Sequence, residues 1–173
     1  MDMPAPDVHH LRAAVGWLEL GNAHETLVEL EKLDASRQLH PGVLETRWLA
    51  LAQLQRWEPA ADTARALVVA APEQAVGWLH RSYALRRVRG GGLQAAFDAL
   101  RPVAEKFPEE ATIPYNLACY TCQLHHDPAE TFAWLEKAVA AGEREEILRM
   151  ALNDPDLEPL HAEIARLPKR AAK

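Results

Sequence analysis

Two cysteines and two histidines lie within one short stretch of the chain: Cys119, Cys122, His125 and His126. Zinc takes cysteine and histidine ligands in a tetrahedral arrangement, and cysteines three residues apart share one face of a helix. Metal or redox sensing is therefore one function that these residues could serve.

Other features of the same stretch favour a structural role. Cys119 and Cys122 fall in the middle of an expected helix, where small side chains suit packing against a neighbouring helix. The short separation between Cys122 and His125 differs from the long one in zinc fingers. Neither cysteine lies at a helix N-terminus, where the pKa of a thiol is lowered. The sequence thus predicts no metal and no cofactor, and the sensor remains the less favoured alternative.

The chain contains no motif that is typical of an enzyme. It has no nucleophile elbow, phosphate-binding loop or dinucleotide fingerprint. The run Gly90-Gly91-Gly92 lacks the Lys-Ser pair and the strand of a phosphate loop. We therefore expect a protein that is not an enzyme.

Composition excludes several other classes of protein. Of 173 residues, 49% are hydrophobic and 25% are charged, which is typical of a folded domain, and the net charge of −6 disfavours nucleic acid and anionic membranes as partners. No apolar run approaches the roughly 18–20 residues that span a bilayer. Residues 1–6 do not resemble a secretory signal, and two cysteines make no disulfide framework. We expect a protein of the cytoplasm.

The elements that would position functional side chains repeat about every 34 residues. Frames start at Asp7, Pro41 and Ala75, and a fourth starts two residues late at Ala111, after the three glycines. The fourteenth position of the frames is apolar throughout: Leu20, Leu54, Val88 and Leu124. Near the twentieth position the residue is small: Thr26, Ala60, Ala96 and Thr131. A period of this length predicts stacked helical hairpins, none of which can bury its apolar face alone.

Local signals place the ends of several helices. Gly21 and Asn22 predict a helix end, and Asp127 followed by Pro128 predicts a capped helix start. Pro102 lies inside a helical pattern, so we expect a kink or a shortened last turn near Arg101.

Small and large side chains have complementary roles in this pattern. Small residues allow the two helices of a hairpin to approach to about 8–10 Å. Bulky side chains are then expected to fill the wider gaps between helices as part of the core: Trp48, Trp57, Trp78 and Trp134.

Over residues 7–141 the chain resembles the tetratricopeptide repeat (TPR) family. The resemblance rests on a leading tryptophan, a turn aromatic, helix-packing alanines, closing prolines and one tetrapeptide run: Trp78, Trp57, Ala60, Ala96, Pro72, Pro108 and Leu117-Ala118-Cys119-Tyr120. It departs from the family at Arg47, Arg81 and His10. The resemblance implies an all-α, right-handed α-solenoid of about four helical hairpins, at residues 7–40, 41–74, 75–110 and 111–141.

A C-terminal cap is expected after the last hairpin. Residues 143–167 look like the closing helix or helix pair of small bacterial TPR proteins, and an end repeat needs a polar outer surface. We expect a helix over residues 143–154, a short last helix ending near Leu167, and flexible termini at residues 1–6 and 168–173.

The resemblance also implies where a partner binds. In TPR folds the first helices of successive repeats line a concave groove, and the corresponding residues here are Glu45, Leu49, Gln53, His80, Tyr83, Arg87, Tyr115, Asn116, Cys119 and Gln123. Tyrosine and arginine often anchor interfaces, so Tyr83, Arg87 and Tyr115 lead this set. The alternative is that these residues are ordinary surface and packing side chains.

A cluster of arginines overlaps the expected groove. It comprises Arg81, Arg86, Arg87, Arg89 and Arg101, in a stretch whose only acid is Asp98. The cluster could steer an acidic peptide or a terminal carboxylate. The alternative is that the arginines pair with acids of neighbouring repeats or are solvated.

These patterns together predict a protein–protein interaction scaffold that binds a peptide or helix of another protein, as a monomer or weak homodimer. Two alternatives are a chaperone-like protein for a secreted or assembling partner, and the sensor that uses the cysteines and histidines. A nucleic-acid binder acting through the arginines is the least favoured, because the chain is acidic overall.

Overall fold

The computed structural model describes residues 5–124 and 127–167, and every regular element within these ranges is helical. The chain divides into two compact units, Met1–Gly92 and Leu93–Lys173, so the boundary falls inside the third predicted repeat. Within the described ranges no helix combines the length and the apolar character that crossing a membrane requires.

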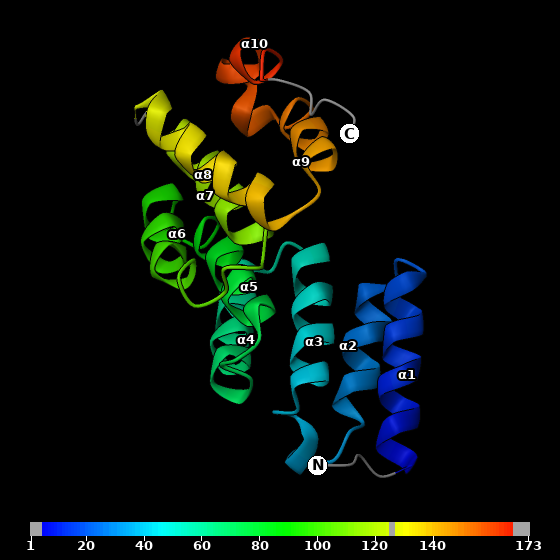
Figure 1. Cartoon of the computed structure of the whole chain (residues 1–173). Helices are drawn as coiled ribbons and strands as arrows, with labels where there is room; N and C mark the ends of the chain where they lie inside the picture. The colour runs from blue at the N-terminus through cyan, green and yellow to red at the C-terminus, as the bar shows by residue number, and fades with distance from the viewer. Residues whose placement is uncertain (1–4, 125–126, 168–173) are drawn as a thin grey trace. The chain divides into compact units, whose positions relative to one another are not determined.

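The first unit is a stack of antiparallel helices (Figure 1). Each helix contacts the next along the chain, and α1 contacts α3 as α3 contacts α5. First helices of successive hairpins therefore lie against one another, as repeat packing requires. The elements are α1 (Ala5–Glu19), α2 (Ala23–Glu31), η1 (Ala35–Arg37), α3 (Pro41–Gln53), α4 (Trp57–Ala70) and α5 (Ala75–Leu85).

The two ends of α1 differ in how well the sequence predicted them. Gly21 adopts a φ of 77°, and the side chain of Asn22 accepts a hydrogen bond from the backbone N–H of Glu25, which confirms the predicted stop and starts α2. At the other end α1 begins at Ala5, so residues 5 and 6 are helical and not part of a flexible terminus. Pro6 is tolerated there because the first turn needs no N–H from it.

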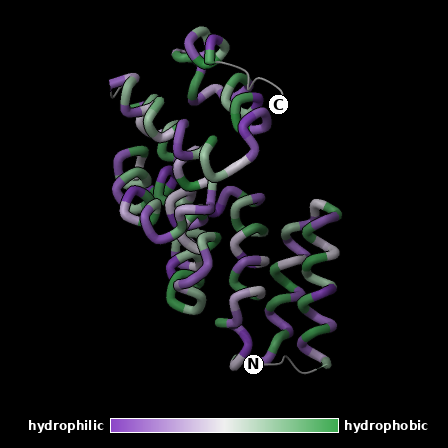
Figure 2. Tube along the Cα trace, in the orientation of Figure 1, coloured by the Kyte–Doolittle hydropathy of each residue, from purple (hydrophilic) through white to green (hydrophobic). Residues whose placement is uncertain are grey.

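The apolar interior of the first unit lies between its helices, whose hydropathy alternates along each ribbon (Figure 2). Thr26 and Ala60, the small residues near the twentieth repeat position, are 0% exposed. Around Ala60 pack Trp48, Leu51, Ala64 and Ala84. These small residues are therefore buried between the helices, as their repeat position predicts.

The four tryptophans assigned to the core differ in their burial. Trp48 is fully inside, at 5% exposure, and Trp57 packs against the same cluster from its edge. Trp78 and Trp134 are only half-buried, so the expectation of core positions is wrong for these two. Trp78 instead donates a hydrogen bond from Nε1 to the carbonyl of Pro72, which ties it to the loop before α5.

The three glycines close the first unit with a tight turn. Gly90 and Gly92 adopt φ angles of 76° and 118°, a region that side chains disfavour. The N–H of Gly92 donates to the carbonyl of Leu85 at 2.9 Å, and a Cβ at Gly91 would collide with that carbonyl oxygen. The glycines are therefore required by geometry and are more than a spacer.

The second unit contains the remaining elements: α6 (Leu93–Leu100), η2 (Arg101–Val103), α7 (Thr112–Gln123), α8 (Pro128–Ala141), α9 (Arg144–Ala151), η3 (Pro155–Leu160) and α10 (His161–Ile164). The α-helix ends at Leu100 and continues as a 3-10 turn that contains Pro102, which confirms the predicted shortened turn. Asp127 caps α8 by accepting a hydrogen bond from the N–H of Ala129, also as predicted.

The C-terminal cap has the expected order of elements, and its last helix is shorter than expected. The predicted helix over residues 143–154 is confirmed as α9, Arg144–Ala151. Before the predicted last helix the chain forms a 3-10 segment, η3, in which Pro155 and Pro159 cannot donate α-helical hydrogen bonds. The predicted short last helix is α10, His161–Ile164, which ends before the expected end near Leu167. The predicted flexible ends at residues 1–4 and 168–173 lie outside the described residues.

Candidate functional site

The expected binding residues fall at matching positions of the repeat. Leu49, Tyr83 and Cys119 share one register position, and Gln53, Arg87 and Gln123 share the position one helical turn later. These residues lie on α3, on α5 or just after it, and on α7, which are the first helices of their hairpins. Residues four apart share a helix face, so α3 and α7 each present both positions on the same side, and Arg87 follows α5 by two residues.

In the first unit the ring of Tyr83 stands among aromatic side chains and remains 40% exposed. Its centroid lies 5.9 Å from that of Trp48, edge to face, and 5.9 Å from that of Trp57. The guanidinium carbon of Arg87 lies 3.5 Å from the Tyr83 centroid and 5.1 Å from that of Trp57. Such contacts between a cation and aromatic rings hold the arginine in place.

Arg87 is held in a second way, by the backbone of α5. Its Nη1 donates a hydrogen bond of 2.9 Å to the carbonyl of Tyr83, one turn earlier in the chain. One of the five guanidinium N–H donors is thereby used. Within residues 5–124 and 127–167, Arg87 forms no ion pair with a carboxylate.

His80 contributes to this arrangement from a partly buried position. Its ring stacks on Trp48 with centroids 3.6 Å apart and planes 4° from parallel. Burial lowers the pKa of His80 to about 4, so the ring is neutral at pH 7. His80 Nε2 and Trp48 Nε1 are buried without a hydrogen-bond partner among the described residues. The stacked rings of Trp48 and His80 are therefore uncharged at pH 7, and Tyr83 contacts this stack through Trp48.

The remaining expected residues of the first unit lie on α3, which contacts α5. Leu49 is 38% exposed, Gln53 is exposed, and Glu45 is half-buried. We use the name Tyr83–Arg87 surface for Leu49, Gln53, Tyr83 and Arg87. It combines two exposed apolar side chains, one cation and one amide, which is the chemistry of a small recognition patch.

In the second unit the equivalent face of α7 is covered by the chain itself. The hydroxyl of Tyr115 donates to Oδ2 of Asp154 at 3.0 Å, and Sγ of Cys119 donates to the same oxygen at 3.5 Å. Nε2 of Gln123 donates to the backbone carbonyl of Asp156 at 2.8 Å. Tyr115 is only 5% exposed, and its burial raises the pKa of the phenol above the usual range.

Apolar side chains complete this covering segment. Leu157 is 0% exposed and Leu160 is 9% exposed. His161, which follows the segment, contacts its first residue: Nε2 of His161 lies 3.1 Å from the carbonyl oxygen of Asp154. Of the expected residues of this unit, Asn116 is half-buried, and Tyr115 and Gln123 serve as donors to the segment. The pattern of Asp154 to Leu160 did not by itself reveal this contact.

The same place contains the one group of possible metal ligands found among the described residues. Cys119 Sγ and one carboxylate oxygen each of Asp154 and Asp156 lie within 4.8 Å of one another. Both oxygens of Asp154 already accept hydrogen bonds, Oδ1 from the N–H of Asp156 at 2.9 Å. Burial raises the pKa of the Cys122 thiol, which opposes thiolate formation. His125 and His126, the other residues of the sensor alternative, lie outside the described residues.

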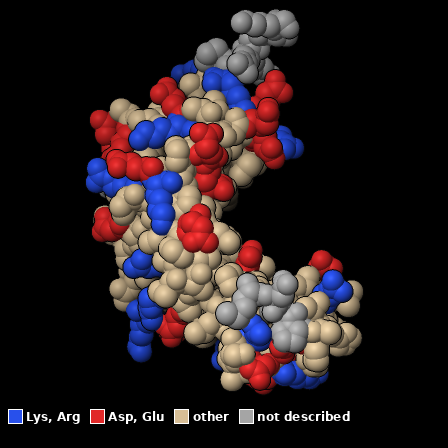
Figure 3. Space-filling model, turned by 60° about the horizontal axis from the view of Figure 1, so that its bottom comes forward, with Lys and Arg blue, Asp and Glu red and all other residues tan. Residues whose placement is uncertain are grey.

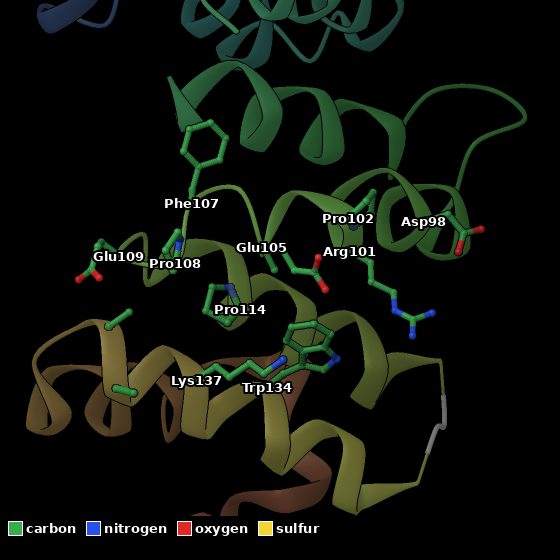
Figure 4. A pocket seen from close by; sticks show the side chains of 13 residues that line it. Asp98, Arg101, Pro102, Glu105, Phe107, Pro108, Glu109, Pro114, Trp134 and Lys137 are labelled. Carbon is green, nitrogen blue, oxygen red and sulfur yellow. The ribbon is translucent and has the colours of Figure 1, made fainter. Parts of the chain in front are cut away.

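Sequence reasoning did not find a hollow in the second unit, between the segment of residues 98–109 and α8 (Figure 4). Its volume is about 1000 Å³. Three prolines, Phe107 and Trp134 line it, together with side chains of both charges. The ammonium of Lys137 lies 4.2 Å from the Trp134 ring centroid and so already covers that ring. Trp134 is half-buried because it lines this hollow.

The arginine cluster is divided between the two units. Arg81, Arg86, Arg87 and Arg89 belong to the first unit and Arg101 to the second. Arg101 lies 5.9 Å from the Phe97 ring centroid, and the backbone N–H of Arg89 donates to Glu58. On the face shown in Figure 3, acidic and basic side chains are interspersed. That distribution gives no extended field of one sign.

Comparison with known proteins bears on the fold. No family model matches the chain, and no curated protein matches it. A solved structure of a thermophilic TPR protein from Thermus thermophilus is similar over 93% of this chain and 100% of its own, with a TM-score of 0.65 and 20% sequence identity. This similarity confirms the predicted all-α helical-repeat architecture. The chain therefore has the tetratricopeptide-repeat fold.

Proposed function

We propose that this protein is a protein–protein interaction module whose partner contacts the Tyr83–Arg87 surface. The observation that carries the proposal is the state of Tyr83: an aromatic ring 40% exposed, fixed between two tryptophans and covered on one side by a guanidinium. Rigid aromatic and arginine side chains lose little conformational entropy on binding, and they are enriched among residues that dominate binding energy.

The test is capture of partners from the source organism by the immobilised chain. A Tyr83→Ala/Arg87→Ala double variant removes the ring and the cation, and it should lose the captured protein. Val69→Ala is the matched control, since Val69 is an 82% exposed apolar residue on α4, outside the surface. Circular dichroism establishes that all three proteins are equally helical. Identical captured proteins with and without the double substitution would refute the assignment of this surface.

A chaperone-like role for an assembling partner is the second candidate, and exposed apolar side chains on and after α1 favour it. Trp17 is 38% exposed and Leu20 is 77% exposed. Such a protein would associate with itself through apolar surface when no partner is bound. Sedimentation velocity of the chain and of Trp17→Glu/Leu20→Glu tests this: a dimer that the substitutions dissociate supports the role, and a concentration-independent monomer excludes self-association.

A further inference from the structure

The covering segment of the second unit reveals which chemistry fits a first-helix face of this protein. The segment brings one carboxylate to the register position of Cys119 and one backbone carbonyl to that of Gln123. Three residues after the aspartate it buries a leucine completely, at 0% exposure for Leu157. Asp154 to Leu157 is thus an acidic turn followed by an apolar anchor, bound through side-chain donors of a helix.

The same register positions in the first unit carry stronger donors. Tyr83 takes the place of Cys119, so a hydroxyl replaces a thiol. Arg87 takes the place of Gln123, so a cation replaces a neutral amide. Hydrogen bonds from a charged donor to a carboxylate are stronger than neutral ones. Gln123 donates to a backbone carbonyl, and Tyr115, the hydroxyl donor to Asp154, has Leu79 as its counterpart in the first unit. The cation Arg87 is therefore the feature that favours an acidic occupant of this surface.

Charge and exposure on the first unit agree with this inference. Arg87 uses Nη1 for the Tyr83 carbonyl, and it has no carboxylate partner within the described part of the chain. Leu49, 38% exposed on the neighbouring α3, offers an apolar contact one helix away. The Tyr83–Arg87 surface therefore presents an anion-binding group beside an apolar one.

We propose that the Tyr83–Arg87 surface binds an internal acidic segment of a partner protein, in which an aspartate is followed three residues later by leucine. The aspartate carboxylate contacts Arg87 and the hydroxyl of Tyr83, and the leucine packs against Leu49. The covering segment of α7 is the internal example of such a ligand. This inference rests on the proposed function and specifies the chemistry of its partner.

The probe for the test is a fluorescent peptide with the sequence of residues 153–160, acetylated and amidated so that it has no terminal charge. Fluorescence anisotropy measures its dissociation constant for the full-length protein. We expect saturable binding that weakens about tenfold when both aspartates of the peptide become asparagine, and about tenfold when its leucines become alanine, because a charge-assisted contact and a buried leucine each contribute on this scale.

Protein variants assign the site. Arg87→Gln should weaken binding about tenfold, and Arg81→Gln, an equal loss of charge in the same region of the chain, should change it less than about twofold. Val69→Ala, at an exposed apolar site on α4 outside the surface, should have no effect. Circular dichroism and thermal melting verify the fold of each variant.

Several outcomes would overturn the inference. These are absence of saturable binding, equal weakening by Arg81→Gln and Arg87→Gln, and equal weakening by Val69→Ala and Arg87→Gln. If the peptide fails to bind but capture still depends on Tyr83 and Arg87, the partner has a different chemistry and the proposed function stands. If both measurements are insensitive to these residues, both proposals are refuted.

Discussion

The first-helix faces of the two units carry corresponding residues in different states. In the first unit Tyr83 is 40% exposed, whereas in the second its counterpart Cys119 is 4% exposed beneath a returning segment of the chain. Both helices present side-chain donors at the same register positions. The state of the α7 face comes from the sequence that follows that helix, because residues 154–160 return to it.

This difference separates two uses of one repeat position. A donor that is satisfied within the chain contributes to stability, and a donor that remains exposed is available for recognition. Natural repeat proteins need end caps that remove apolar surface from water, and the α7 face serves that need here. Substitutions that uncover the α7 face, or that remove side chains of the Tyr83–Arg87 surface, therefore test whether the first contributes to stability and the second to recognition.

The largest effect on stability is expected at Leu157, the fully buried leucine of the segment that covers α7. Leu157→Ala removes a fully buried side chain and should lower the free energy of unfolding by about 2–5 kcal/mol, measured by urea denaturation. Leu20→Ala, at a site 77% exposed, should change it by less than about 0.5 kcal/mol. Equal effects of the two substitutions would mean that the segment is not packed on α7.

The stability of the first unit should depend on pH through His80, which stacks on Trp48 beside the Tyr83–Arg87 surface. Between pH 6.5 and 4 the unfolded chain binds a proton at this residue and the folded chain does not, because burial lowers its pKa to about 4. Stability is therefore fully present above pH 6.5 and falls as the pH decreases, by up to about 3 kcal/mol. His80→Phe keeps a stacked ring and should flatten this part of the curve of melting temperature against pH. A parallel curve for the variant would contradict the assignment.

Substitution of Asp154, the first residue of the segment that covers α7, should have a smaller effect on stability. Asp154→Ala removes the acceptor for Tyr115, Cys119 and the N–H of Asp156, and should cost about 1–3 kcal/mol. The ultraviolet absorption of the tyrosines reports a second consequence, a lower pKa of Tyr115 as water reaches its phenol. Asp62→Ala, at an exposed surface pair with Arg65, is the control and should be nearly neutral.

The smallest effect on stability is expected at Arg87. Arg87→Gln loses contacts with two rings at a partly exposed site, which should cost about 0.5–1 kcal/mol by thermal or urea denaturation. A larger loss would place Arg87 among the structural residues and remove the contrast with Asp154. A loss within this range, combined with weaker partner capture, would assign it to recognition.

Local signals in the sequence were sufficient for much of the fold. The shortened turn at Pro102 and the cap at Asp127 depend on residues within one helical turn, so their chemistry can be recognised without a structure. The burial of Thr26 and Ala60 follows from their repeat position. Fold and helix ends were therefore predictable where neighbouring residues determine them.

Features that depend on distant segments were not predictable in the same way. The contact of Tyr115 with Asp154 joins residues 39 positions apart, and nothing in either local pattern specifies the other. The half-buried state of Trp134 depends on a hollow formed by residues 98–109. For the candidate site, the sequence nominated Tyr83 and Arg87 by residue type, but the cation–ring geometry that distinguishes them required coordinates.

The glycine turn that ends the first unit has a consequence for engineering. Because any side chain at Gly91 would displace the carbonyl that ends α5, this junction accepts neither substitution nor insertion without rebuilding the turn. Chimeras that exchange hairpins with other repeat proteins should therefore keep residues 85–92 intact and be joined elsewhere, for example at the exposed loop residues Glu73 and Gln74 before α5.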